Sequence, residues 1–123
     1  MGDDVKNNQN VMNKLRRSTA YKNIKTDLMK QLKDKGNDSP VFTNLIEDYL
    51  NLWCVKELLL KDIEERGVYI EWRNSDTQYS SKKNDSVQET VKVNNQMLKI
   101  LQQLKLEVRT VPIIETTSDD DEL

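Results

Sequence analysis

The sequence predicts a mainly α-helical fold of three helices, one of them long and central, with a single small β-hairpin. An apolar-rich helical segment runs from Ser39 to Gly67, a period of two follows it, and a second apolar helical pattern ends near Leu106. These two helical patterns hold more apolar surface than one small domain can bury. We therefore expect the chain to assemble into a homo-oligomer of more than four subunits.

A first helix is predicted from about Thr19 to Lys35, with Gly36 as the residue that stops it. Apolar residues recur there at spacings of three and four, and most of the lysines lie off this stripe. The first dozen residues show no sustained period, so residues 1–18 are expected to form a flexible basic arm. The apolar stripe consists of Tyr21, Ile24, Leu28 and Leu32.

The long central helix is predicted to open at Ser39-Pro40 and to end before Gly67. A Ser hydroxyl can accept a hydrogen bond from an unpaired amide at the N-cap, and Pro at the first helical position has no amide to lose. Such a helix would be roughly 40 Å long at ~1.5 Å per residue. It is apolar over more than half its girth through Val41, Phe42, Leu45, Ile46, Tyr49, Leu50, Leu52, Trp53, Val55, Leu58, Leu59, Leu60 and Ile63.

A β-hairpin is predicted near residues 68–81, because the sequence period changes to two after Gly67. Asn74-Ser75-Asp76 has the composition of a turn, and Thr77-Gln78-Tyr79 can return as the partner strand. The alternation places two sets of side chains on opposite faces of the first strand. These sets are Val68, Ile70 and Trp72, and Tyr69, Glu71 and Arg73.

A last helix, capped by Asp85 or Ser86, is predicted to run to about Leu106. It carries two neighbouring apolar stripes, and two stripes need two surfaces to bury them. One stripe follows a strict 4-3-4 spacing, and we expect it to form the oligomer interface together with Trp53 of the long helix. The stripe predicted at the interface is Val93, Met97, Ile100 and Leu104; the second is Val87, Val91, Leu98 and Leu101.

Charge is distributed in blocks, although the net charge is only −2. Residues 1–35 carry nine Lys or Arg against four Asp or Glu, residues 36–67 three against seven, residues 68–109 seven against five, and residues 110–123 none against five. This alternation predicts a basic surface for a polyanion; the alternative is that charged faces merely solvate the helices. The candidates for contacting the phosphates of such a polyanion are Arg16, Arg17, Lys22 and Lys25, with Arg73, Lys82 and Lys83 as a second patch.

Residues 110–123 are predicted to form a flexible acidic tail. Pro112 prevents a helix from continuing, and the like charges after it cannot pack together. A short apolar segment followed by acidic residues has the composition of a docking peptide for a basic partner. The tail could instead keep the oligomer soluble or compete with DNA for the basic block. The docking candidates are Ile113, Ile114, Asp119, Asp120 and Asp121.

The composition excludes several kinds of function. One cysteine and no histidine exclude a disulfide framework, a Cys/His zinc site and every His-dependent triad. The only glycines are Gly2, Gly36 and Gly67, so there is no phosphate-binding loop. No run approaches the ~18 to 20 apolar residues of a membrane span, and the start lacks a signal-peptide pattern. We therefore expect a protein that is not an enzyme, binds no metal or cofactor and stays in a cytoplasm.

Some conspicuous residues have both a structural and a functional interpretation. Cys54 has apolar neighbours and no histidine to activate it, which favours a core position. Trp53 on an apolar helix is interpreted as packing, whereas Trp72 on the hairpin is open to either packing or base stacking.

Three carboxylates lie close together in sequence where the long helix ends, namely Asp62, Glu64 and Glu65. Like charges are unfavourable there, because the helix dipole is negative at that end. A two-metal nuclease would need carboxylates that converge from several elements. These residues are interpreted instead as facing a basic neighbour across a subunit interface.

The order of elements and the residues at their joints resemble the small subunit of tailed-bacteriophage terminases, over roughly Lys22 to Val111. Two boundary positions depart from that family: Asn84-Asp85 stands where Asn-Pro is common, and Leu104-Lys105-Leu106 stands in place of Leu-Gly-Leu. The resemblance rests first on the long helix, which contains Tyr49, Leu52 and Trp53 and ends in an acidic turn and Gly67. It rests also on Tyr69 in the hairpin. The last helix completes it, since Lys83-Asn84 opens this helix and Leu101, Leu104 and Leu106 close it.

The resemblance implies a non-enzymatic adaptor that forms a ring, recognises the packaging start on concatemeric viral DNA, and presents this DNA to the large terminase subunit. The large subunit would hold the ATPase motor and the nuclease. It would also be the partner to which the acidic tail docks, and both subunits would work in the host bacterial cytoplasm.

Two alternatives remain. A helix-turn-helix transcription regulator could place Tyr21 to Gly36 before a helix from Ser39, although residues 41–63 are more apolar than a recognition helix. The third interpretation is a structural phage adaptor without DNA contact.

Overall fold

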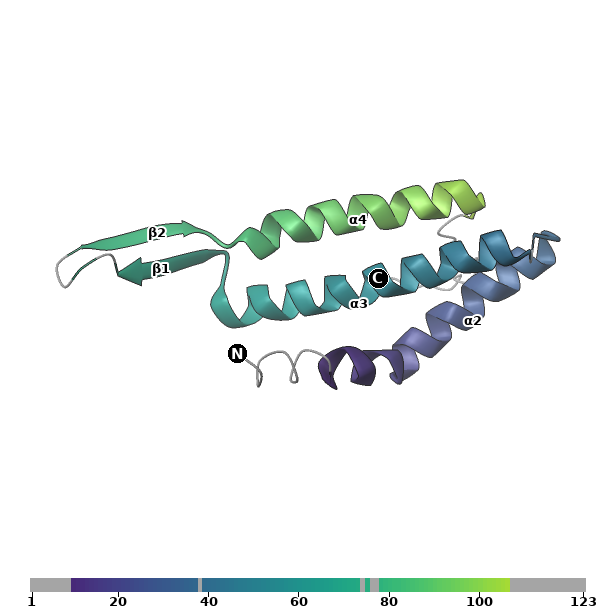
Figure 1. Cartoon of the computed structure of the whole chain (residues 1–123), viewed down its shortest axis with the longest axis horizontal. Coiled ribbons are helices and arrows are strands. Elements are labelled where there is room, and N and C mark those ends of the chain that lie inside the picture. Colours follow the sequence, from purple (N-terminus) through teal and green to yellow (C-terminus); the bar gives the residue numbers. More distant parts are fainter. Residues whose placement is uncertain (1–9, 38, 74, 76–77, 107–123) are drawn as a thin grey trace, which may run out of the picture.

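A computed structural model describes residues 10–37, 39–73, 75 and 78–106, and within them the fold is mainly helical with one hairpin. A short helix at residues 10–16 precedes α2 (Thr19–Asp34), α3 (Pro40–Arg66), strands β1 (Tyr69–Arg73) and β2 (Tyr79–Lys83), and α4 (Asp85–Leu104). Helix α3 is central: α4 runs antiparallel along it, and α2 covers only the half remote from the hairpin (Figure 1). The predicted mainly α-helical class with one β-hairpin is confirmed, but the described residues form four helices and not the predicted three.

Helix α2 begins and ends where the sequence predicts. Ser18 caps its start, because the Ser18 hydroxyl accepts a hydrogen bond from the Tyr21 amide at 3.2 Å. Gly36 follows its end with φ of 75°, and the Asn37 amide donates to the Leu32 carbonyl at 2.9 Å. This arrangement satisfies the last carbonyls of the helix and needs a residue that tolerates positive φ.

The basic arm predicted for residues 1–18 is helical over residues 10–16. Met12 and Leu15 of this short helix pack against the hydrophobic core. The short helix has three apolar residues, Val11, Met12 and Leu15, which are too few to set up a sustained period, so the sequence pattern indicated an arm without structure.

The predicted bounds of α3 are also confirmed, but its start is built differently from the prediction. Pro40 occupies the first helical turn, yet the Ser39 side chain makes no capping hydrogen bond. The Ser39 carbonyl accepts from the Thr43 amide at 3.0 Å, and the Thr43 hydroxyl donates to the Pro40 carbonyl at 3.1 Å. Gly67, with φ of 85°, ends the helix.

Strands β1 and β2 pair antiparallel, with Tyr69 opposite Lys83 and Arg73 opposite Tyr79. The hairpin was predicted to end near residue 81, but β2 continues to Lys83. It extends because every residue of β1 has a partner in this register. The hairpin projects beyond the ends of α3 and α4 (Figure 1).

Helix α4 is capped by Asn84, one residue before the predicted Asp85 or two before Ser86. The Asn84 side chain accepts from the Ser86 amide at 3.0 Å. At the other end Lys105 adopts the left-handed conformation with φ of 57°, and the Leu106 amide donates to the Leu101 carbonyl at 2.9 Å.

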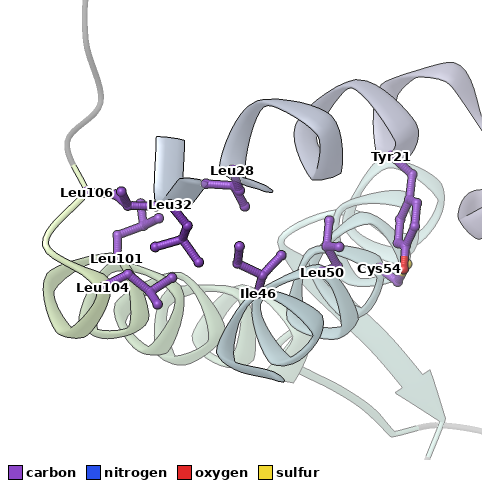
Figure 2. Packing of buried hydrophobic residues seen from close by; sticks show 9 residues of the cluster. All are labelled: Tyr21, Leu28, Leu32, Ile46, Leu50, Cys54, Leu101, Leu104 and Leu106. Atoms are coloured by element: carbon purple, nitrogen blue, oxygen red, sulfur yellow. The ribbon is translucent and has the colours of Figure 1, made fainter. Parts of the chain in front are cut away.

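The core lies where α2, α3 and the end of α4 meet, on the side of the molecule away from the hairpin. Figure 2 shows its members converging from all three helices. The predicted core position of Cys54 is confirmed, since this side chain is fully buried. The core cluster consists of Tyr21, Leu28, Leu32, Ile46, Leu50, Cys54, Leu101, Leu104 and Leu106.

In the part of the chain that the structure describes, we find no helix whose length and hydropathy would let it cross a bilayer.

Candidate nucleic-acid interface

Exposed cations lie along the short helix and α2. Arg16 and Arg17 end the short helix, and Lys22 follows in the first turns of α2. Lys33 lies on the same side of α2 as Lys22, because eleven residues make about three turns. We name five exposed residues the N-terminal cations; within the described residues none of them has an ion-pair partner. They are Lys14, Arg16, Arg17, Lys22 and Lys33.

Lys25, which the sequence groups with these residues, differs from them. Its ammonium nitrogen lies 3.2 Å from a carboxylate oxygen of Glu47 on α3. Both side chains are less than half exposed, so the pair tethers α2 to α3 and already neutralises the charge of Lys25. A pair of this kind contributes little to stability, about 0–1 kcal/mol.

The residues of the second predicted patch, Arg73, Lys82 and Lys83, lie at opposite ends of the hairpin. Lys82 and Lys83 end β2 near α4, and Lys82 lies 3.9 Å from the carboxylate of Asp85. Arg73 ends β1 at the opposite tip of the hairpin, because it pairs with Tyr79 rather than with the lysines. The backbone therefore does not bring these three basic positions together. Tyr69, opposite Lys83, is exposed and adds an aromatic ring to the lysine end.

Trp53 contributes to packing within the single chain. Its ring lies edge-on to the ring of Tyr21, with centroids 6.0 Å apart, and it packs against the core. This contact joins α3 to α2 and favours packing over base stacking for Trp53. The side chain of Trp72 lies outside the described residues.

The apolar stripe of α4 that was predicted to contact other subunits lies mostly inside the single chain. Leu104 is 0% and Met97 4% exposed, and Ile100 packs against the core. Val93 alone is half-buried without belonging to the core cluster or its packed shell. The burial of Leu104 and Met97 within one chain means that neither is accessible to a second subunit in this conformation.

An extensive polar network lies where α3, the hairpin and α4 meet, and we name it the Asn84 junction. Asp62 accepts hydrogen bonds from Arg66 at 2.6 and 2.8 Å, from the Ser86 hydroxyl at 2.6 Å and from the Asn84 amide nitrogen at 3.1 Å. The same Asn84 nitrogen donates to the Gly67 carbonyl at 2.9 Å. Arg66, followed by Ser86, holds the pKa of the Asp62 carboxyl well below its usual range.

Asp62, interpreted from the sequence as facing a basic neighbour subunit, already has a basic neighbour in Arg66 of the same helix. Glu64 and Glu65 are exposed and have no ion-pair partner within the described residues. Among the residues that the structure describes, no three His, Cys, Asp or Glu side chains are grouped so that they could hold a metal.

The candidates for partner docking in the tail, Ile113, Ile114 and Asp119 to Asp121, lie outside the described residues. The helix-turn-helix alternative gains no support from the described part. A recognition helix needs a free face to enter the DNA groove, whereas the half of α3 that follows α2 lies between α2 and α4 (Figure 1).

In its described part the chain is mainly helical, and exposed cations lie along the short helix and α2. The family described as phage terminase, small subunit, matches residues 20–119, so the chain belongs to the phage terminase small subunit family. Comparison with curated proteins and with solved structures gave no match. The family membership gives the chain a role in phage DNA packaging.

Proposed function

We propose that this chain is the terminase subunit that recognises viral DNA and delivers it to the large subunit, the ATPase and nuclease of the packaging machine. The subunit itself is a non-enzymatic adaptor that works in the host cell as a ring of more than four copies. The family membership supports the packaging role, and the surfaces of the fold support the binding of DNA.

The observation that carries DNA binding is the set of N-terminal cations. Arg16, Arg17 and Lys22 are exposed and have no carboxylate partner among the described residues, so phosphates can replace water and counterions around them. They also come from two helical elements that adjoin, which lets them contact phosphates along one stretch of DNA. The hairpin lysines are the second candidate, because Lys83 is exposed beside Tyr69.

Delivery to the large subunit assigns a role to the acidic tail. Its apolar and acidic residues, Ile113, Ile114 and Asp119 to Asp121, have the composition to dock a basic surface of that partner. Removal of residues 115–123 should lower stimulation of the large subunit's ATPase and leave the oligomer unchanged. Full stimulation by the shortened chain would contradict this role.

The experiment that tests DNA binding is a titration of the full chain with its phage DNA at several salt concentrations. We expect weak binding per subunit, multiplied in the oligomer, that falls steeply as salt rises. The double variant Arg16→Ala/Arg17→Ala should bind more weakly and keep its oligomer, while Lys30→Ala, already paired with Asp34, serves as the matched control. Unchanged DNA retention by the double variant at ~100 mM salt would move the interface to the hairpin lysines.

A further inference from the structure

The halves of α3 and α4 next to the hairpin form a two-helix arm, defined as residues 55–66 and 85–96. Helix α2 covers only the other half of α3, so the arm lacks a third helix (Figure 1). No hydrophobic side chain of the arm is buried, although eight are present. They are Val55, Leu58, Leu59, Leu60, Ile63, Val87, Val91 and Val93.

One side of the arm is marked by a hydrogen bond between the helices, from the Lys56 ammonium to the Asn94 side-chain oxygen at 2.9 Å. Leu60 lies one turn beyond Lys56, and Val91 and Leu98 lie one turn to either side of Asn94, so all three flank this bond. Leu60 is 42%, Val91 57% and Leu98 46% exposed. We name these three residues the first apolar side, which extends two residues beyond the arm to Leu98.

The opposite side of the arm is apolar as well. Leu58 is two positions from Leu60 and Val93 is two positions from Val91, and two positions rotate a side chain by about 200° around the helix axis. Leu58 and Val93 are half-buried and form the second apolar side. A single partner protein would need only one apolar side of the arm for its contact. Two opposite apolar sides fit a row of identical copies, in which each arm contacts one neighbour on either side.

Charges next to these sides are complementary. Glu57 and Glu64 lie three residues before and four after Leu60, which places them beside the first apolar side. Lys61 lies three residues after Leu58, beside the second, and has no ion-pair partner within the described residues. Identical arms placed side by side would set the glutamates of one copy against Lys61 of the next.

We infer that the occupant of this surface is a second copy of the chain, with the first apolar side of one arm packed against the second apolar side of the next. This rests on the proposed function, whose ring it provides with a contact. The contact is heterologous, because each copy uses two different sides, and a heterologous contact forms a ring when the rotation from one copy to the next closes. It replaces the predicted contact through Met97 and Leu104, and it keeps Val93.

The first test is Leu60→Asp, which places a charge on an exposed arm residue and leaves the core untouched. We expect the assembly to dissociate in light scattering, with the concentration for half-assembly raised more than about tenfold. Val41→Asp is the matched control, since Val41 lies on the same helix outside the arm and is 70% exposed. A wild-type mass of monomer or dimer at micromolar concentration would overturn the inference, as would an unchanged mass for Leu60→Asp.

The second test is a charge exchange. Glu64→Lys alone and Lys61→Glu alone should each weaken the assembly, and the double variant should restore it, because the pair is then re-formed with reversed signs. A double variant no better than the single ones would overturn the proposed pairing. DNA retention measured on the same samples separates the arm contact from DNA recognition. A stable assembly that retains no DNA would count against the proposed DNA recognition and not against the arm contact. A monomer that binds DNA would count against the arm contact and the ring, and not against DNA recognition.

Discussion

Asn84 holds the carboxylate of Asp62 from the opposite side of the hairpin, 22 residues further along the chain, at 3.1 Å. Asn84 is fully buried, and its side chain also contacts the Gly67 carbonyl and the Ser86 amide. One side chain thus joins the last turn of α3, the entry to the hairpin and the first turn of α4.

Replacement of Asn84 by Ala should destabilise the fold by about 1–3 kcal/mol, because it removes the cap of α4 and leaves the Gly67 carbonyl without its donor. Urea unfolding followed by circular dichroism measures the change. The control is Asn95→Ala, an exposed position on the same helix, where we expect a change below about 0.5 kcal/mol. Equal stability of both variants would show that the junction does not hold the fold together.

The Asn84 junction also makes stability depend on acid. The pKa of Asp62 is lowered in the folded state, chiefly by its hydrogen bonds to Arg66, so folding favours the charged form. Its contribution to the free energy of unfolding is complete above the ordinary Asp range near pH 4, and is lost as the pH falls below that range. Unfolding measured from pH 6 to pH 2 should therefore show less acid sensitivity in Asp62→Asn than in the wild type. A parallel decline in the two proteins would contradict this assignment.

Lys105 occupies a backbone conformation that favours glycine, since its φ is 57°. Lys105→Gly should raise the free energy of unfolding by up to about 1 kcal/mol, because it removes the steric cost of a side chain there. The hydrogen bond from the Lys35 ammonium to the carbonyl of residue 105 uses the backbone and can remain. Lys99→Gly, within α4, should have the opposite effect of roughly 1 kcal/mol. Thermal unfolding of the two variants tests the difference in sign.

Leu104→Ala should act on the fold of the single chain and not on a contact between chains. Its side chain is fully buried among residues of α2 and α3, and such truncations cost about 2–5 kcal/mol. Val41→Ala, at an exposed site, should change stability by less than about 0.5 kcal/mol. Light scattering on folded Leu104→Ala would decide the matter: dissociation without loss of stability would return Leu104 to the subunit interface.

The ion pair of Lys25 with Glu47 separates two lysines that the sequence treats alike. Lys22→Ala should weaken DNA binding and reduce the dependence of log affinity on log salt by about one unit per copy that contacts a phosphate. Lys25→Ala should have a smaller effect on DNA, because Lys25 already has a carboxylate partner. Salt-dependent titrations of both variants make the comparison. A larger effect for Lys25 would show that DNA displaces Glu47.

The sequence predicts the helix bounds well because local signals fix them: Gly36 and Gly67 stop helices, and Pro40 starts one. It does not predict how one helix stripe is shared between the core and the surface, which depends on where α2 covers α3. Leu104 and Leu98 have the same side chain, yet the first is fully buried and the second exposed. The apolar periodicity of the sequence includes both leucines and cannot tell the buried position from the exposed one.

The candidate site is predictable only in part for a similar reason. A count of basic residues identifies the region of Arg16 and Arg17, but whether a lysine has a partner depends on contacts such as Lys25 with Glu47, 22 residues away. The Asn84 junction was missed because its members come from three elements. Asn84 directly before a helix was the one local signal of a cap, and the sequence interpretation placed the cap one or two residues later.

Cys54 makes the chain suited to a measurement of its own opening. The thiol is fully buried in the cluster that Tyr21 of α2 helps to form, and burial raises its pKa, so it reacts slowly while the helices are closed. It is the only cysteine of the chain. The rate at which a thiol reagent labels the native protein therefore reports how often α2 detaches from α3, and comparison of this rate with and without DNA would reveal whether the N-terminal cations bind DNA with α2 in place.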